Sequence, residues 1–379
     1  MSTKAVLGKF SSRLKMGIVG LPNVGKSSTF NLFSTSKQSD AQNYPFCTID
    51  PTQAIVQLED PRFDRLCEIF QPRSRVPASY EIIDIAGLIS GAHRNEGLGF
   101  KFLDNIANCN GIFNLVRLFP DDDVSHVEGT VDPVRDLEII ADELRLRDLA
   151  VVIGMLPQFE KDAHHDVEAR KALAIVERVR DALENGQHVR FVDWHENDVE
   201  TVNSLHLLTA KPSIYLLNMS EHDFLRKKNK HLKRVFQWVQ ANGGEQIVPF
   251  SCSMEQEIIR DPEYEHKDES QLDKILSAGF KCINLISFFT CGADEVRAWN
   301  LRSGNGFNTA VNAAGVIHND LKNSFRSAEI YKYSDIDELG RESEVRAKGL
   351  LKTVGRTYLV EDGDCCYFKA TLARSGKRK

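Results

Sequence analysis

The sequence contains no hydrophobic run long enough to cross a membrane as a helix. A spanning helix needs about 18 or more apolar residues, whereas the longest apolar run in the 379-residue chain, from Leu149 to Leu156, is about half of that. The amino-terminal segment is basic but lacks the apolar stretch of a secretory signal. These absences exclude membrane-spanning classes and predict a cytoplasmic protein without a membrane partner.

The sequence also lacks cysteines at the spacing of metal or redox sites. Its eight cysteines are scattered over the chain without a C-x-x-C pair, and a chain of this length can build a core without disulfides. His164 and His165 are adjacent, but no cysteine or second histidine pair stands at ligand spacing from them. We therefore expect reduced thiols and no structural zinc site.

A strong excess of charge of either sign is absent as well. The chain has 48 Lys and Arg against 54 Asp and Glu, a net charge of −6, with ordinary shares of hydrophobic (42%) and charged (27%) residues. This average hides an uneven distribution, because the region from Leu285 onward carries 15 basic and 12 acidic residues and the remainder is acidic. Net charge alone therefore gives little information about a nucleic-acid partner.

A glycine-rich motif near the amino terminus is the most informative feature. Residues 16–33 read as a short apolar strand, a glycine-rich turn and a helix, which is the context of a P-loop. The residues that match the P-loop pattern are Gly20, Gly25, Lys26 and Ser27. Backbone N–H groups, the helix N-terminus and the lysine hold phosphate oxygens, while the serine hydroxyl binds Mg²⁺. The alternative, an ordinary glycine-rich turn, does not require this combination.

Two further segments predict the phosphate side of the site. An apolar strand ends in the D-x-x-G motif of Asp84 and Gly87, where the carboxylate can hold the Mg²⁺ shell and the glycine N–H can reach the γ-phosphate. Thr48 is placed like the switch threonine that senses γ-phosphate and Mg²⁺. The alternatives are an accidental D-x-x-G at a strand end and a loop threonine that makes a local turn.

A third apolar strand ends in Asn-Met-Ser-Glu at residues 218–221. GTPases carry Asn-Lys-x-Asp here, and the aspartate accepts the two N–H groups of guanine, whereas adenine presents an acceptor that repels a carboxylate. We therefore expect Glu221 to point elsewhere, Asn218 to bond the base edge and Met219 to pack on the base face. Ser251 follows the next strand and would complete the pocket. ATP is the expected substrate, with GTP weaker.

Together these motifs resemble the YchF or Obg-like ATPase family of P-loop NTPases, and its eukaryotic branch most. The matching stretches, GLPNVGKSS, NYPFCTI, DIAGL, DDDVSHVEG, LTAKPSIYLLNMSE and FFTCGADEVRAW, span essentially the whole chain. The resemblance implies a cytosolic, Mg²⁺-dependent ATPase that also uses GTP. It further implies association with ribosomes, through the large subunit or rRNA, and contacts with the proteasome. We expect a monomer.

The resemblance also implies roles for individual residues. The family lacks the glutamine that GTPases place after D-x-x-G, and Leu88 stands there in this chain. His126 matches the family's candidate for orienting water, although a loop histidine is more often a surface residue. Asn23 matches the asparagine that holds K⁺ in potassium-dependent relatives, and Phe119 lies near the position that packs the nucleotide.

The complete set of predicted site residues follows from these motifs. The predicted catalytic residues are Lys26 and His126. The predicted nucleotide-binding residues are Asn23, Val24, Gly25, Lys26, Ser27, Ser28, Gly87, Phe119, Asn218, Met219 and Ser251. The predicted metal ligands are Ser27, Thr48 and Asp84 (directly or through water) for Mg²⁺, and Asn23 for K⁺.

The predicted fold class is α/β, a P-loop NTPase doubly wound sheet with an inserted α-helical hairpin and a C-terminal β-grasp (TGS) domain. Apolar residues at helical spacing predict the hairpin, with helices that merely cover the sheet as the alternative. The predicted segments are 14–131 and 206–281 for the nucleotide-binding domain, 132–205 for the helical insertion, 282–370 for the TGS domain and 371–379 for a basic tail. At residues 311–312 Val-Asn replaces the Pro-Gln usual in the family's TGS segment.

Three functional hypotheses remain. The first is an ATPase switch in which residues 43–50 and 88–100 respond to the nucleotide. The second is a binding scaffold that holds ATP as a structural ligand. The third, a small-molecule kinase, would need an arginine-rich lid, and the sequence has no such cluster. Basic residues at 226–234 and 377–379 raise RNA contact as a hypothesis, against the simpler explanation of solvated charge.

Overall fold

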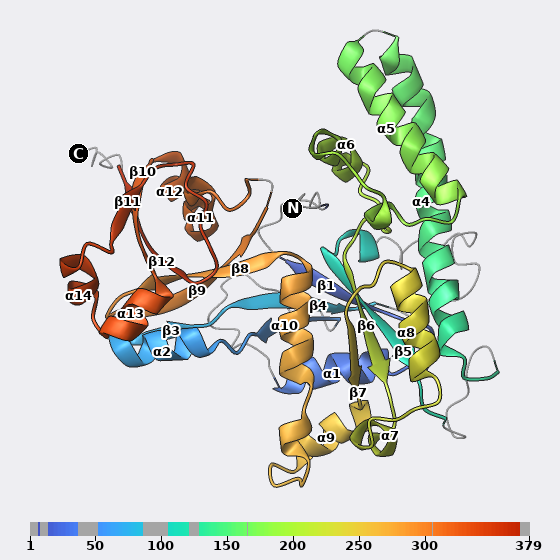
Figure 1. The fold of residues 1–379 in the computed structure, drawn as a ribbon, viewed down its shortest axis with the longest axis horizontal. Coiled ribbons are helices and arrows are strands. Elements are labelled where there is room, and N and C mark those ends of the chain that lie inside the picture. The colour runs from blue at the N-terminus through green and yellow to red at the C-terminus, as the bar shows by residue number, and fades with distance from the viewer. Residues whose placement is uncertain are drawn as a thin grey trace, which may run out of the picture. The chain divides into compact units, whose positions relative to one another are not determined.

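The computed structural model describes residues 7, 14–36, 52–85, 105–120, 129–164, 166–304 and 306–371. By their contacts these residues form two compact units (Figure 1). The first unit contains the described residues up to 36 and those within 52–56 and 80–282. The second unit contains the described residues within 57–79 and 283–371. Among the helices of the described ranges, none combines the length and apolarity that crossing a membrane requires.

The first unit is built on a six-stranded sheet in the order β2-β4-β1-β5-β6-β7. Its strands are β1 (Lys15–Val19), β2 (Gln53–Gln57), β4 (Ser79–Asp84), β5 (Gly111–Arg117), β6 (Ser213–Asn218) and β7 (Ile247–Phe250). All pairings from β4 to β7 are parallel. Strands β5 and β6 are buried at every residue, because a parallel sheet is covered on both faces.

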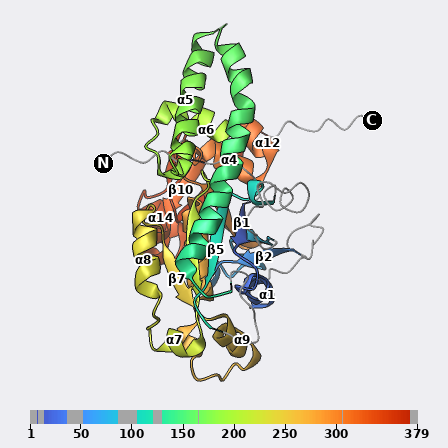
Figure 2. The same ribbon diagram turned by 90° about the vertical axis from the view of Figure 1, so that its right-hand side faces the viewer.

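Helices cover this sheet on both faces (Figures 1 and 2). The helices of the first unit are α1 (Lys26–Ser36), α4 (Pro133–Ala163), α5 (Val167–Glu184), α6 (Val199–Ser204), α7 (Glu221–Leu225), α8 (Leu232–Ala241), α9 (Cys252–Arg260) and α10 (Leu272–Cys282). Phe113 of β5 packs against Phe33 of α1, whereas Val116 of the same strand packs with α8. This arrangement confirms the predicted doubly wound sheet.

Helices α4 and α5 form the predicted hairpin, and they lie side by side in both views (Figures 1 and 2). Val176, Val179 and Leu183 of α5 are fully buried in a cluster that includes Val152 of α4. The beginning of α4 has another role, because Leu137 packs with residues of β5, β6 and α8. The amino-terminal part of α4 therefore covers the sheet, and its carboxyl-terminal part forms the hairpin.

The second unit is a mixed sheet in the order β11-β10-β12-β8-β9-β3. Its strands are β3 (Ser74–Val76), β8 (Leu285–Cys291), β9 (Glu295–Arg302), β10 (Phe325–Lys332), β11 (Lys352–Val354) and β12 (Asp364–Ala370). Its helices are α2 (Pro61–Phe70), α11 (Ala310–Ile317), α12 (Asn319–Asn323), α13 (Tyr333–Leu339) and α14 (Glu342–Ala347). Strands β12 and β8 are parallel, whereas β8–β9 and β10–β12 are antiparallel. The predicted C-terminal α+β unit is thus present.

Residues 57–79 differ from the predicted domain boundary. The prediction placed them in the nucleotide-binding domain, within 14–131, but the structure groups them with the second unit. The physical reason is that α2 buries its apolar face, including Phe63 and Leu66, in the core of that unit. Strand β3 also pairs with β9 there. The other predicted boundaries remain predictions.

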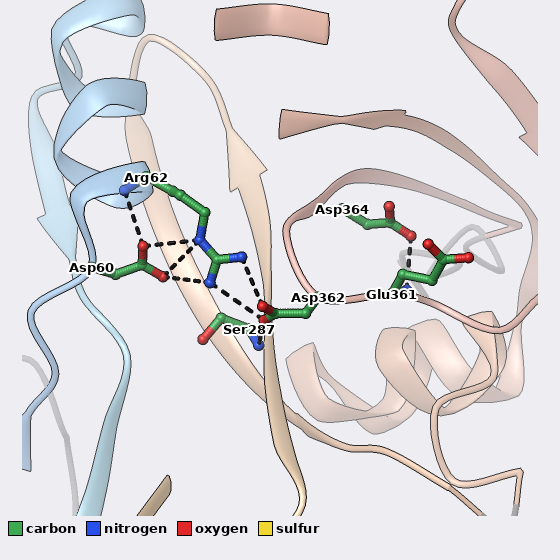
Figure 3. Close-up of polar contacts among 6 residues, drawn as sticks. All are labelled: Asp60, Arg62, Ser287, Glu361, Asp362 and Asp364. Carbon is green, nitrogen blue, oxygen red and sulfur yellow. Dashed lines mark hydrogen bonds and ion pairs between the residues drawn. The ribbon is translucent and has the colours of Figure 1, made fainter. Parts of the chain in front are cut away.

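Polar contacts of Asp60 and Arg62 connect residues 57–79 to the rest of the second unit (Figure 3). Arg62 donates to Asp60 (Nη2–Oδ2 2.8 Å) and to Asp362 (Nη1–Oδ2 2.8 Å). Asp362 in turn accepts a hydrogen bond from the Ser287 backbone N–H at 2.9 Å. Residues more than two hundred positions apart in the sequence are therefore joined through one guanidinium.

Candidate functional site

The loop between β1 and α1 adopts the backbone shape that a P-loop needs. Asn23 and Gly25 have left-handed φ values of 62° and 100°, a region that asparagine tolerates and glycine enters freely. A Cβ atom at Gly25 would lie 2.6 Å from Nδ2 of Asn218. Glycine is therefore required at position 25 by both the backbone angle and the space.

Lys26 begins α1 and turns back over this loop. Its side chain is buried, and Nζ donates to the Leu21 carbonyl oxygen at 2.7 Å. Burial lowers the pKa of Lys26 to about 8, an effect that the charge of Asp84 partly opposes. An ammonium group with so little contact with water gains strongly from an anionic partner.

Ser27 and Asp84 meet beside the lysine. The parallel register pairs Asp84 with Ile18, and the Ser27 hydroxyl donates to Oδ2 of Asp84 at 2.8 Å. The other carboxylate oxygen, Oδ1, is buried and accepts no hydrogen bond from any described residue. Such an oxygen needs a partner, and Mg²⁺ with its water ligands would supply one. The two side chains therefore fit Mg²⁺, which commonly uses one or two protein ligands together with phosphate.

Asn218, at the end of β6, joins two parts of the site. Its Nδ2 donates to the Val24 carbonyl oxygen at 3.1 Å, and its Oδ1 accepts from the Cys252 N–H at 3.1 Å. The side chain is buried. Asn218 thus links the P-loop to the start of α9, in addition to any contact with a base.

Ser251 follows Phe250 of β7, which pairs with Asn218 of β6. It is fully buried and forms the N-cap of α9, where its hydroxyl accepts from the Met254 N–H at 3.4 Å. Its side chain therefore stabilises the helix terminus that borders the site.

Met219 lies elsewhere than expected. Its side chain is 2% exposed and packs in the apolar cluster that contains Leu118 and Val235. Successive residues of an extended chain point to opposite sides, so Met219 faces the core where Asn218 faces the P-loop. This burial contradicts the predicted packing of the Met219 side chain on a base.

Glu221 points away to a partner of its own, in agreement with the prediction. Its Oε1 accepts a hydrogen bond from the Tyr264 hydroxyl at 2.5 Å. This hydrogen bond is the main reason why the pKa of Tyr264 rises to about 12. The carboxylate that follows Asn218 is therefore engaged with the segment after α9.

Sequence reasoning missed Arg117, which ends β5 and is 1% exposed. Its Nε donates to the Phe119 carbonyl oxygen at 3.0 Å, and its Nη1 donates to that of Asn23 at 3.4 Å. The guanidinium also lies 4.7 Å from the centre of the half-buried Phe119 ring. Two predicted site residues are thus connected by an arginine whose only sequence signal is its place at the end of an apolar strand.

The remaining predicted residues divide into two groups. Val24 is buried, and Ser28 is partly exposed in the first turn of α1. Thr48, Gly87, His126 and the nearby Leu88 lie outside the described residues, so their roles remain predictions. Within the described ranges, no three His, Cys, Asp or Glu side chains cluster in a way that could hold a metal ion by protein ligands alone.

Comparison with known proteins gives consistent matches over the full chain. The chain is 47% identical over 384 residues to Obg-like ATPase 1 of Oryza sativa subsp. japonica, an alignment that covers 99% of this chain and 96% of the relative. The chain belongs to the Obg-like ATPase, or YchF, family. Obg-like ATPase 1 of Homo sapiens is 44% identical over 386 residues, with the same coverage.

Family models and a solved structure agree with membership of the Obg-like ATPase family. Residues 15–155 match a model described as 50S ribosome-binding GTPase, and residues 285–371 match YchF-GTPase_C, described as a protein of unknown function (DUF933). The structure of the Schizosaccharomyces pombe YchF GTPase superposes with a TM-score of 0.86 at 42% identity, covering 97% of this chain and all of that one. Like its relatives, this Obg-like family member is a P-loop nucleotide-binding protein of the GTPase-type fold.

Proposed function

We propose that the protein hydrolyses ATP, prefers ATP to GTP and acts as a nucleotide-dependent switch. The observation that carries this proposal is the engagement of Glu221 with Tyr264. A GTPase needs a free carboxylate near this position to accept the N–H groups of guanine. The printed names of relatives differ, since some are called ATPases and one is called a GTPase, so the choice needs a direct test.

The proposed site divides its tasks among a few residues. The P-loop N–H groups and Lys26 would bind the phosphates, with the nucleotide replacing the Leu21 carbonyl as the partner of Lys26. Ser27, Asp84 and Thr48 would hold Mg²⁺, which offsets the negative charge of the phosphates. Asn23 would hold K⁺ at the exposed rim of the loop. With Leu88 in place of a glutamine, His126 would orient the attacking water.

Binding of ATP and GTP separates the specificity hypotheses. Thermal-shift titrations of the full chain with ATP, GTP and their diphosphates should show tighter binding of ATP. Glu221→Gln removes the carboxylate charge and should leave this order unchanged, because that group does not read the base. Tighter binding of GTP than ATP would overturn the proposal.

A second candidate, a nucleotide-binding scaffold with negligible turnover, is favoured by Leu88 at the position of the GTPase glutamine. Potassium-stimulated ATP turnover of wild type, Lys26→Ala and His126→Ala distinguishes the two. An ATPase should lose turnover in both variants, whereas a scaffold should give equal, near-zero rates in all three proteins.

We further propose a cytoplasmic monomer that associates with ribosomes, through the large subunit or rRNA, and with the proteasome. Support comes from the description of the model matched by residues 15–155, which names ribosome binding. Co-sedimentation of the full chain with purified ribosomal subunits, with and without ATP, tests the main partner. If the same amount of protein sedimented with and without added ribosomal subunits, the proposed association with ribosomes would be contradicted.

A further inference from the structure

Helix α8 and the edge strand β7 border an apolar groove of about 330 Å³ on the first unit. In the described part of the chain, β7 is the last strand of its sheet, with β6 as its neighbour. The apolar residues that line this edge groove are Leu217, Leu232, Phe236, Ile247 and Pro249. Pro249 has no N–H group and disfavours pairing with an added strand. A partner is therefore expected to bind in this groove through a side chain and not as an additional strand of the sheet.

Phe236 is an exposed aromatic residue at this groove. It is 57% exposed, whereas its neighbours Val235 and Val239 are fully buried and attach α8 to the sheet. Leu232 and Phe236 are four residues apart, so they share one side of the helix. An aromatic side chain that does not support the fold but borders a groove is typical of a protein contact.

A basic loop precedes this side of α8. From residue 224 to residue 244 the chain has no Asp or Glu. The cations are Arg226, Lys227, Lys228 and Lys230 before α8 and Lys233 and Arg234 in its first turn, all of them exposed. Arg234 also pairs with Asp132 at 3.4 Å. The loop has a defined position, because Asn229 Nδ2 donates to the Leu118 carbonyl oxygen at 3.0 Å and to Asp223 Oδ2 at 2.7 Å.

The acidic residue that lines the groove, Glu245, is already neutralised. Its carboxylate accepts two hydrogen bonds from Arg190, at 2.8 Å and 3.2 Å. Both side chains are largely buried, with exposures of 15% for Glu245 and 9% for Arg190. The charge that a partner would meet here is therefore the positive charge of the basic loop.

We propose that the edge groove and the basic loop together bind an acidic segment of a partner protein. One large apolar side chain of that segment fills the groove beside Phe236, and its carboxylates lie over residues 226–234. RNA could use the same cations and stack a base on Phe236, but it has no flexible apolar side chain to fill the groove. This surface does not depend on the proposed ATPase activity.

Selection from a phage-displayed library of random dodecapeptides, with the full chain as bait, tests the proposal. The selected peptides should carry several Asp or Glu next to one large apolar residue. Fluorescence anisotropy of the best labelled peptide should show binding about tenfold weaker for Phe236→Ser. The triple variant Lys227→Gln, Lys228→Gln and Lys230→Gln should weaken binding at low salt by a similar factor.

Matched substitutions elsewhere serve as controls. Val167→Ser changes an equally exposed apolar residue, at 55%, and the triple variant Lys322→Gln, Lys348→Gln and Lys352→Gln removes the same charge from the second unit. Neither should change the dissociation constant. Failure to select peptides, selected peptides without acidic residues, or equal effects of Phe236→Ser and Val167→Ser would overturn the proposal. So would tighter binding of a labelled single-stranded RNA that is insensitive to Phe236→Ser.

Discussion

At the scale of single residues, the site combines close neighbours in the sequence, Lys26 and Ser27, with Asn218, whose partners are distant in the sequence. The P-loop pattern predicted a loop followed directly by a helix, and Lys26 and Ser27 are the first two residues of α1. The role of Asn218 as a link between Val24 and Cys252 could not be predicted, since its partners lie 194 and 34 positions away. For the same reason Tyr264 was not expected beside Glu221.

The lowered pKa of Lys26 predicts how nucleotide binding depends on pH. The free protein loses the proton of Lys26 as the pH rises through about 8, and phosphate pairs with the protonated form. Above that pH, binding must take up a proton, so the dissociation constant of Mg²⁺-ATP should rise, by at most about tenfold per pH unit. Titrations with a fluorescent ATP analogue measure this, and the exposed-site variant Lys348→Gln should follow the wild-type curve. A dissociation constant that stays constant above pH 8 would contradict the prediction.

Asn218→Ala should destabilise the first unit by about 1 to 3 kcal/mol, because the buried N–H of Cys252 loses its acceptor. Affinity for nucleotide should fall as well, since the P-loop loses its link to α9. Urea denaturation monitors the first effect. Asn242→Ala removes an exposed asparagine that bonds only within its own helix terminus, and it should cost no more than about 0.5 kcal/mol. Equal stability of the two variants would argue against the link.

At the scale of elements, apolar spacing predicted two helices in the insertion. The α5 stripe packs in the hairpin cluster, whereas Leu137, from the stripe that predicted α4, packs on the sheet. Apolar spacing did not predict how the insertion returns to the sheet. Asp148 of α4 is 1% exposed and accepts hydrogen bonds from the Leu208 N–H (2.9 Å), the Thr209 N–H (2.7 Å) and the Thr209 hydroxyl (2.6 Å). A charged residue in the middle of a helix gives no sequence signal of such an anchor.

Asp148→Ala should therefore loosen the return segment. Three donors would lose their acceptor, and we expect a loss of about 2 to 3 kcal/mol in the free energy of unfolding. Part of this loss is offset, because burial raises the pKa of Asp148 to about 6 and the ionised carboxylate is itself unfavourable above that pH. Amide hydrogen exchange at residues 205–211 should rise. Asp142→Ala, on the exposed side of the same helix, is the control and should leave this exchange unchanged.

At the scale of the whole molecule, the two-unit organisation was predictable in outline but not in its boundaries. The alternation of strands and helices predicted the parallel sheet, and the change to short strands after about residue 282 predicted the second unit. The sequence did not predict that residues 57–79 belong to the second unit, because a linear division of the chain assumes that neighbours in sequence share a core. The amphipathic helix α2 of this segment would suit either unit, and only the tertiary partners, Phe289 among them, decide the choice.

Arg62→Gln tests this assignment. Arg62 connects α2 to Asp362, so its loss should raise amide hydrogen exchange in α2 and around Asp362. Strands β5 and β6 of the first unit should exchange as in the wild type, since they share no core with α2. We expect a cost of about 1 to 2 kcal/mol for the second unit, because two carboxylates lose a charge-assisted partner. Arg65→Gln is the matched control on the same helix, where ion pairs with Glu68 and Asp337 are exposed and contribute little to stability. If exchange rose instead in β5 and β6, residues 57–79 would belong with the nucleotide-binding sheet, and the boundary inferred from the structure would be wrong.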